Sequence, residues 1–325
     1  MRGPKGSFVM KIVLLEGLAV ADAAVQTLAE PLRAAGHQFT AYNDGATDPA
    51  VLTQRAKDAD ILMVASAPLP AAVVAACPNL KLISVAFTGV DHLPMDLCRE
   101  RGILVSNCAG YSTESVAELV FGLVFSLLRR IPACNEACRA GGTKAGLVGF
   151  ELAGKTFGIV GTGAIGLRTA TLAKAFGCHL VAYSRTHRPE AETLGIRYLS
   201  LEEVMSTADI ISLHLPSTPK TAGIINAALI AKMKPTALLI NTARGAVLDN
   251  TALADALLAG RIAGAGIDVF ETEPPIANDH PLCRAPNAIL TPHVAFATAE
   301  SMQVRANMVF DNVSLYLAGT PRNLM

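Results

Sequence analysis

The sequence predicts an α/β protein with two doubly wound parallel sheets, each in a domain of its own. Three observations support this prediction. Short strand-like runs alternate with helical runs along the chain. The 325 residues are more than one hydrophobic core usually organises. Hydrophobic residues make up 51% of the chain and charged residues 17%, which is typical of a well-packed α/β protein.

The first hundred residues contain five apolar runs that are short and rich in β-branched side chains. They predict strands at Lys11–Leu15, Gln38–Tyr42, Ile61–Ala65, Leu80–Ala86 and Ile103–Asn107. A helix is predicted at Ala23–Ala35, where Gly36 ends it, and a longer one at Ser112–Arg130. Because the apolar residues of this longer helix cover more than one face, we expect it to be buried between domains or subunits.

The second half of the chain predicts six strands joined by five crossovers, which is the doubly wound pattern. The strands lie near Ile159 and Val181 and at Ile210–Leu213, Ala237–Ile240, Gly264–Val269 and Ala288–Thr291. Helices are expected at Leu167–Phe176, Leu201–Ser206, Ala227–Met233 and Asn250–Ala259. A last helix at Ala299–Ala318 follows this unit, and we expect it to pack back on the N-terminal domain.

A glycine motif of the form G-x-G-x-x-G stands between the strand Thr156–Val160 and the helix that follows it. The glycines allow a tight turn, the approach of a pyrophosphate to bare backbone, and close contact between helix and strand. The phosphate charge is then stabilised by the helix N-terminus. The motif therefore predicts a dinucleotide site formed by Gly161, Gly163, Ala164, Ile165 and Gly166.

The residues after the next strand bear on which dinucleotide binds. An NAD site usually has an acidic residue about 20 positions after the motif, to bond the ribose 2′-hydroxyl. Here that place holds Ser184, Arg185 and Thr186, and no acidic residue occurs between Gly166 and Glu190. Arginine matches a 2′-phosphate in charge and geometry. We therefore expect NADP(H) as the preferred cofactor, with NAD(H) as the alternative.

Charge and cysteine content argue against several other classes of protein. Lys+Arg and Asp+Glu number 27 each, so the zero net charge favours neither nucleic acid nor an anionic membrane as a partner. No metal site is expected from the seven cysteines, since Cys134 and Cys138 have no completing ligands. We expect reduced, buried thiols in a cytoplasmic protein. Residues 1–9 are expected to be neither a signal peptide nor part of the fold.

Polar residues follow three predicted strands, at the edge where such sheets bind their ligands. The segments are Asn241–Gly245, Asp268–Pro275 and Thr291–His293. Together they bring a guanidinium, a carboxylate and an imidazole to one edge, which is more informative than any of these groups alone.

With the glycine motif, these segments resemble the signatures of the D-isomer-specific 2-hydroxyacid dehydrogenases, in order and spacing, over nearly the whole chain. The resemblance implies two Rossmann-like domains with the active site in the cleft between them. A flavodoxin-like substrate domain would comprise 1–108 plus 298–325, and the dinucleotide-binding domain 109–297. It also implies a homodimer joined largely through helices such as Ser112–Arg130.

The resemblance further implies a role for each matching residue. His293 would be the acid/base, Glu273 its carboxylate partner, and Arg244 the group that grips the substrate carboxylate. The other side of that carboxylate would be held by Phe87, Thr88 and Gly89. Asp268 would face the nicotinamide carboxamide, and further cofactor contacts would come from Thr242, Ala243, His214, Leu215 and Pro216.

The implied reaction is the reduction of a small 2-oxo acid by hydride transfer. Ser184 and Arg185 resemble the glyoxylate/hydroxypyruvate reductases, whereas Phe296 is closer to the D-lactate dehydrogenases. The loops around Glu16-Gly17-Leu18, Phe87 and Phe296 are expected to form the pocket for the substrate side chain. A D-lactate- or phosphoglycerate-type dehydrogenase and a non-enzymatic nucleotide-sensing corepressor remain as alternatives.

Overall fold

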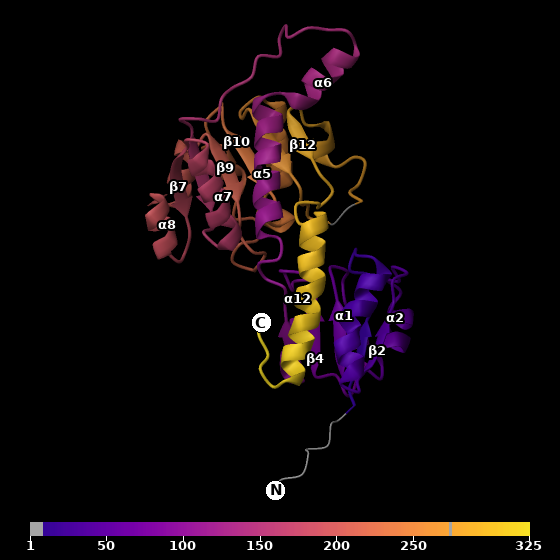
Figure 1. The fold of residues 1–325 in the computed structure, drawn as a ribbon. Helices are drawn as coiled ribbons and strands as arrows, with labels where there is room; N and C mark the ends of the chain where they lie inside the picture. Colours follow the sequence, from indigo (N-terminus) through magenta and orange to yellow (C-terminus); the bar gives the residue numbers. More distant parts are fainter. Residues whose placement is uncertain (1–8, 273–274) are drawn as a thin grey trace. The chain divides into compact units, whose positions relative to one another are not determined.

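A computed structural model describes residues 9–272 and 275–325 of the chain, which form two compact units (Figure 1). Unit 1 combines residues up to Ser112 with Thr298–Met325, and unit 2 comprises Thr113–Ala297. The sequence places the first boundary after residue 108, four residues before the division seen in the structure. Glu273 and residues 1–8 lie outside the described residues, so the predictions made for them stay predictions.

Unit 1 is a five-stranded, fully parallel sheet with the order β2-β1-β3-β4-β5. Its strands are β1 (Lys11–Leu14), β2 (Gln38–Ala41), β3 (Ile61–Val64), β4 (Leu82–Val85) and β5 (Leu104–Ser106). All five were predicted, and β3 and β4 are buried along their whole length because helices cover both faces of such a sheet. The helices are α1 (Asp22–Ala34), α2 (Pro49–Ala56), α3 (Ala71–Ala75), α4 (Met95–Glu100) and α12 (Ala299–Leu317).

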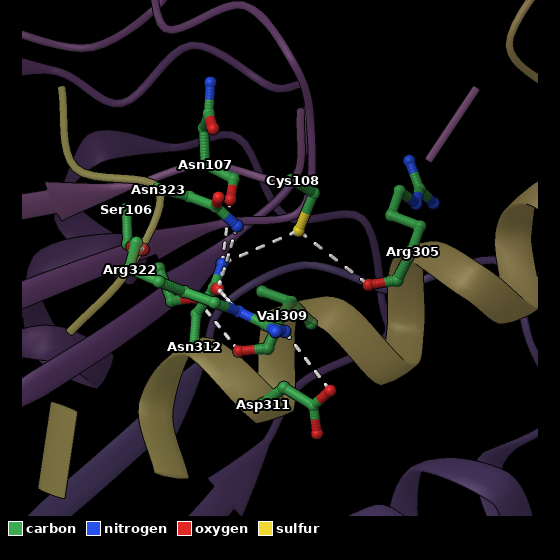
Figure 2. Close-up of polar contacts among 10 residues, drawn as sticks. Ser106, Asn107, Cys108, Arg305, Val309, Asp311, Asn312, Arg322 and Asn323 are labelled. Atoms are coloured by element: carbon green, nitrogen blue, oxygen red, sulfur yellow. Dashed lines mark hydrogen bonds and ion pairs between the residues drawn. The ribbon is translucent and has the colours of Figure 1, made fainter. Parts of the chain in front are cut away.

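The C-terminal segment belongs to unit 1, as the sequence predicts, since α12 packs against α1 and β4. Asn312 on α12 donates a hydrogen bond to the carbonyl of Asn107 (2.8 Å) and accepts one from Arg322 Nε (3.1 Å) (Figure 2). Because Asn312 is almost fully buried, these bonds satisfy polar atoms that would otherwise be costly to bury. They connect α12 and the C-terminal segment to the loop after β5 within unit 1.

Unit 2 contains a parallel sheet of seven strands in the order β12-β11-β10-β9-β6-β7-β8. Its strands are β6 (Thr156–Val160), β7 (His179–Tyr183), β8 (Arg197–Tyr198), β9 (Ile210–Leu213), β10 (Leu238–Asn241), β11 (Gly264–Ile267) and β12 (Ala288–Leu290). The prediction of six strands was wrong by one, because β8 has only two residues and shows no alternation of its own.

Two hydrophobic clusters cover the two faces of this sheet, with successive strand residues pointing to opposite sides. Ile159 packs with α5 and α7, whereas Val160 packs with α9 and α11. The helices of unit 2 are α5 (Thr113–Leu128), α6 (Ile131–Arg139), α7 (Ala164–Ala175), α8 (Pro189–Leu194), α9 (Leu201–Thr207), α10 (Ala227–Ile230) and α11 (Asn250–Leu258). Short 3₁₀ turns occur at Gly245–Val247 and Pro281–Arg284.

The helix predicted at Ser112–Arg130 ends earlier than expected. α5 ends at Leu128, because Arg130 adopts a left-handed conformation (φ 52°) and a proline enters the first turn of α6. None of the nine residues of α6 is buried. Helices α2, α3, α4 and α8 were also not predicted, because they are short and weakly periodic.

The cysteines are all free thiols, but they are not all buried as expected. Four are buried, Cys134 is half-buried, and Cys138 and Cys283 are exposed. Among residues 9–272 and 275–325, no helix is long and apolar enough to cross a membrane, and no cluster of His, Cys, Asp and Glu has the arrangement of a metal site.

Candidate active site

The glycine motif forms the turn between β6 and α7, and its three glycines meet different demands. Gly161 has a φ of +105°, and a Cβ there would lie 2.7 Å from the carbonyl oxygen of His214. A Cβ at Gly166 would collide with the Gly161 carbonyl, so this glycine brings helix and strand together. Gly163 instead faces open space and begins α7 without any side-chain cap. The backbone donors of this helix N-terminus therefore fit a phosphate group.

The loop after β7 is joined to the glycine turn by hydrogen bonds that the sequence did not reveal. The Tyr198 hydroxyl lies 3.0 Å from Thr162 Oγ1 and accepts a bond from the backbone N–H of Arg188 (3.2 Å). Thr162 Oγ1 in turn donates to the carbonyl of Thr186 (3.4 Å). The His187 ring stacks on Tyr198 at 3.8 Å between centroids. Tyr198 therefore fixes the backbone of a loop whose Arg185 side chain is exposed.

His214 follows β9, beside the glycine turn. Its backbone N–H donates to the carbonyl of Val160 (2.8 Å), and its Nε2 lies 2.9 Å from Ser212 Oγ. Desolvation lowers the pKa of His214 to about 3, so the imidazole is neutral at physiological pH. A neutral His214, followed by Leu215 and Pro216, forms an uncharged wall at this end of the predicted cofactor site.

The loop after β10 positions Arg244. Asn241 organises the turn, because its side chain accepts from the N–H of Ala243 (3.1 Å) and donates to the carbonyl of Arg244 (3.0 Å). Gly245 allows the turn to pack on the loop after β11, since a Cβ there would collide with the carbonyl of Phe270. The hydroxyl of Thr242 is buried and has no hydrogen-bond partner among the described residues. The Thr242 hydroxyl can therefore donate a hydrogen bond to a bound group or accept one from it.

His293 follows β12 and is held by Asp268 from the neighbouring β11. The fully buried Asp268 carboxylate accepts from Thr291 Oγ1 (2.6 Å) and from the N–H groups of Val294 and Ala295 (2.9 Å each). The N–H of His293 donates to the Asp268 carbonyl (2.8 Å). These bonds hold His293 in a left-handed conformation (φ 55°), which a residue with a Cβ rarely adopts.

Both oxygens of the Asp268 carboxylate accept hydrogen bonds from the loop of His293. The predicted contact of Asp268 with the nicotinamide carboxamide stays a prediction. The ring of Phe296 meets that of His293 edge-to-face at 5.2 Å. In the sheet, β11 lies between β10 and β12. Arg244 follows β10 and His293 follows β12, so the two residues come after strands that lie on either side of β11. Glu273, the predicted partner of His293, lies outside the described residues.

The loop after β4 in unit 1 holds Phe87, Thr88 and Gly89. The side chain of Asn107 donates to the carbonyl of Thr88 (2.7 Å), and the N–H of Cys108 donates to that of Phe87 (2.9 Å). The Phe87 ring is buried beside Tyr111, with 6.4 Å between ring centroids. Phe87 therefore supports the loop from inside unit 1, while Thr88 and Gly89 are half-buried.

Comparisons with known proteins identify the family to which the chain belongs. Residues 121–295 match the family model for the D-isomer specific 2-hydroxyacid dehydrogenase NAD binding domain. The chain is 34% identical over 323 residues to a hydroxypyruvate reductase of Blautia hydrogenotrophica, covering 97% of this chain and 99% of the relative. It is 37% identical over 324 residues to a glycerate dehydrogenase of Methylorubrum extorquens, covering 97% and 98%.

Among solved structures, an acyclic imino acid reductase in complex with NADPH and D-Arg matches with a TM-score of 0.88 at 29% identity, covering 97% of this chain and 100% of that one. The family match spans the glycine turn and the loops of unit 2 that carry Arg244 and His293, and the whole-length relatives also cover the parallel sheet of unit 1. The chain therefore belongs to the D-isomer-specific 2-hydroxyacid dehydrogenases, which are nicotinamide-dinucleotide-dependent oxidoreductases acting on hydroxy acids.

Proposed function

We propose that this protein is an NADPH-preferring reductase of a small 2-oxo acid of the glyoxylate or hydroxypyruvate type. The observation that carries the cofactor preference is the loop after β7. Ser184 stands where an acidic residue would read an NAD ribose, and the exposed Arg185 and Arg188 follow it. Tyr198 and Thr162 join this loop to the glycine turn and so fix the backbone that carries the two arginines.

The residues of the glycine turn fit a bound dinucleotide. Open space at Gly163, an uncapped α7 N-terminus and the unpartnered Thr242 hydroxyl are features that a cofactor would use. When bound, the reduced nicotinamide supplies a hydride to the carbonyl carbon of the substrate.

His293 gives the proton that the substrate oxygen needs, and Glu273 keeps the imidazole charged and oriented. Arg244 binds the substrate carboxylate and polarises the adjacent carbonyl. Thr88 and Gly89 of unit 1 offer backbone N–H groups to the other side of that carboxylate. The support for these roles is the position of Arg244, His293 and Thr88 after their strands, together with the family membership.

A D-lactate-type reduction of pyruvate is the second candidate, and one observation favours it. Phe296 packs against the His293 ring at 5.2 Å, so an apolar group stands beside the acid/base. Such a neighbour suits a methyl side chain better than a hydroxymethyl one.

We further propose that the protein is a cytoplasmic homodimer. The wholly unburied α6 and the exposed Val148 and Phe150, at 78% and 67%, supply an apolar surface of the kind that subunits cover. These residues follow α5, the helix from which the sequence predicts a subunit contact. Free, partly exposed thiols suit a reducing compartment.

Initial rates test the proposal most directly. The purified protein is assayed with NADPH and with NADH against glyoxylate, hydroxypyruvate, pyruvate and a bulkier 2-oxo acid. We expect the highest kcat/KM with NADPH as the cofactor and either glyoxylate or hydroxypyruvate as the substrate. Activity with NADH alone would overturn the cofactor proposal, and a preference for pyruvate would select the second candidate.

The Arg185→Ala variant sharpens the cofactor assay. We expect it to weaken NADPH about tenfold or more and NADH much less, because only NADPH carries the 2′-phosphate. Arg261→Ala is the matched control, since this exposed arginine lies in the turn after α11. Equal losses for both cofactors in Arg185→Ala would mean that Arg185 does not bind the 2′-phosphate.

A further inference from the structure

Tyr198 lies on the two-residue edge strand β8, and its main chain is fixed by the sheet of unit 2. It is paired in register with Ala182 of β7, and the N–H of Leu199 donates to the carbonyl of Ala182 (2.9 Å). The ring of His187 is parallel to the Tyr198 ring, with 3.8 Å between the centroids and 8° between the planes. The strand and the stacked ring together therefore set the position of the Tyr198 hydroxyl.

The hydroxyls of Tyr198 and Thr162 form a series of hydrogen bonds whose donors can be assigned. Thr162 Oγ1 has a single proton and donates it to the carbonyl of Thr186 (3.4 Å). In the 3.0 Å contact between the two hydroxyls, Tyr198 is therefore the donor and Thr162 the acceptor. Tyr198 in turn accepts from the N–H of Arg188 (3.2 Å). Each hydroxyl thus donates one hydrogen bond and accepts one, and we call this series the hydroxyl bridge.

Both ends of the hydroxyl bridge lie on the loop after β7. The bridge begins at the N–H of Arg188 and ends at the carbonyl of Thr186, so it fixes the backbone before and after His187. Its two hydroxyls come from other elements, since Thr162 belongs to the turn after β6 and Tyr198 to β8. The loop is therefore held by two segments that are distant from it in the sequence.

The hydroxyl bridge also joins the two phosphate-binding parts of the proposed cofactor site. Thr162, which is 1% exposed, stands between Gly161 and Gly163 in the turn proposed for the pyrophosphate. Arg185 and Arg188 belong to the loop proposed for the 2′-phosphate. NADPH has a phosphate for each part, whereas NADH has no phosphate for the loop. A loop that is already held in place loses less conformational freedom when it binds, and this favours NADPH alone.

We propose that Tyr198 is a positioning residue that sets the preference for NADPH over NADH. It acts through the hydroxyl bridge, by holding the backbone that carries Arg185 and Arg188 to the glycine turn before the cofactor binds. This inference rests on the proposed function, since it concerns how the same cofactor site recognises the 2′-phosphate. It makes the cofactor preference depend on a strand outside the loop as well as on the arginines.

The test measures the Kd of NADPH and of NADH by fluorescence titration in the wild type, Tyr198→Phe and Thr162→Val. Tyr198→Phe keeps the aromatic ring that stacks on His187 and removes only the hydroxyl, and Thr162→Val keeps the shape of its side chain. We expect each variant to bind NADPH about fivefold more weakly and NADH less than about twofold more weakly. Tyr316→Phe is the matched control, because it removes a phenolic hydroxyl from α12 in unit 1 and should change neither Kd.

The double variant Tyr198→Phe/Thr162→Val distinguishes one shared bridge from two independent contacts. Each single substitution already breaks the hydroxyl bridge, so the double variant should bind NADPH less than about twofold more weakly than either single variant. Independent contacts would instead multiply their effects to about 25-fold. That result would overturn the inference.

A purely structural role of Tyr198 would lower thermal stability, or weaken both cofactors equally, without changing the ratio of the two Kd values. An unchanged ratio in Tyr198→Phe, with a wild type that prefers NADPH, would therefore reject the inference and leave the proposed cofactor in place. If Tyr198→Phe does not fold, the ratio in Thr162→Val decides.

If the wild type binds NADH as tightly as NADPH, the proposed cofactor preference fails, and amide hydrogen exchange tests the positioning role separately. The N–H of Arg188 should then exchange about tenfold faster in Tyr198→Phe than in the wild type or in Tyr316→Phe. Faster exchange would keep Tyr198 as the residue that positions the loop. Equal exchange would reject that role whichever cofactor binds.

Discussion

The two parallel sheets of this chain differ in whether the backbone N–H groups at the carboxyl ends of their strands are free or already hydrogen-bonded. In unit 2 the turn after β6 presents Gly163 to open space at the uncapped start of α7, so its N–H groups are available to a phosphate. In unit 1 three N–H groups after β3 are already bound by Glu16. The N–H groups of unit 2 are thus open to a ligand, whereas those of unit 1 are bound by a side chain of the chain itself.

A second contrast concerns the two carboxylates themselves. Glu16 and Asp268 both accept backbone N–H groups from a neighbouring loop. Asp268 is fully buried and holds the backbone around His293, whereas Glu16 is half-buried and holds the loop after β3. The same kind of contact thus holds the loop of His293 in unit 2 and the loop after β3 in unit 1.

The largest expected effect concerns the acid/base assigned to the edge of unit 2. Replacing His293 with Ala should lower kcat by about 10²–10⁴-fold, which is the usual contribution of general acid–base catalysis. The measurement is kcat with saturating cofactor. His179→Ala is the control, because His179 begins β7 and therefore lies at the amino ends of the strands, opposite the end that His293 follows. A kcat near that of the wild type in His293→Ala would remove His293 from the mechanism.

The next effect concerns the buried Asp268 carboxylate. Asp268→Asn places an amide where N–H donors converge, so we expect a loss of about 1–3 kcal/mol in the free energy of unfolding and a lower kcat. Denaturant unfolding and initial rates measure the two quantities. Asp255→Asn, which changes an exposed carboxylate on α11, should alter neither. Unchanged stability in Asp268→Asn would show that these bonds do not hold the His293 loop.

Two glycine variants compare Gly163, where a Cβ would meet open space, with Gly166, where a Cβ would collide with the Gly161 carbonyl. Gly163→Ala should weaken dinucleotide binding about tenfold or more, because its methyl group would occupy the space left for the pyrophosphate. Its cost in stability should stay below about 1 kcal/mol, since φ is an ordinary −72°. Gly166→Ala should instead destabilise the fold by several kcal/mol, about the cost of overpacking a core.

Cofactor titration and thermal unfolding of both glycine variants provide the readout. If Gly163→Ala bound the dinucleotide as tightly as the wild type does, the open edge of unit 2 would not be its phosphate site.

The smallest effect concerns the buried hydroxyl after β10. Thr242→Val removes a group that has no partner within the described chain, so the unfolding free energy should stay the same or rise. Dinucleotide affinity should fall by a few-fold, which corresponds to one hydrogen bond of about 1 kcal/mol. Isothermal titration separates the two effects. A stability loss without any change in affinity would assign Thr242 to the core alone.

Much of the fold followed from local patterns in the sequence. Five strands of unit 1 and six of unit 2 are marked by short apolar runs, and the distinct roles of Gly161 and Gly166 follow from the spacing of the motif. β8 and α6 did not follow, because a two-residue strand has no periodicity and the break at Arg130 depends on a left-handed residue.

Candidate site residues divide in a similar way. Arg244 and His293 were predicted because polar residues after parallel strands share one edge. Tyr198 was missed, because nothing local shows that an aromatic residue on β8 reaches Thr162, 36 residues away. The dominant contacts of Asp268 were missed for the same reason, since its partners lie 23 to 27 residues further along the chain.

By itself the sequence determined the two parallel sheets, the dinucleotide turn and the family, because each depends on the identity and spacing of residues close together in the chain. The tertiary structure alone decided what the acidic groups do. Glu16 meets N–H groups 49 to 51 residues away, and it does so because β1 and β3 are neighbours in the sheet. A backbone N–H has no residue identity to read, so contacts of this kind become visible only when the strands have been placed side by side.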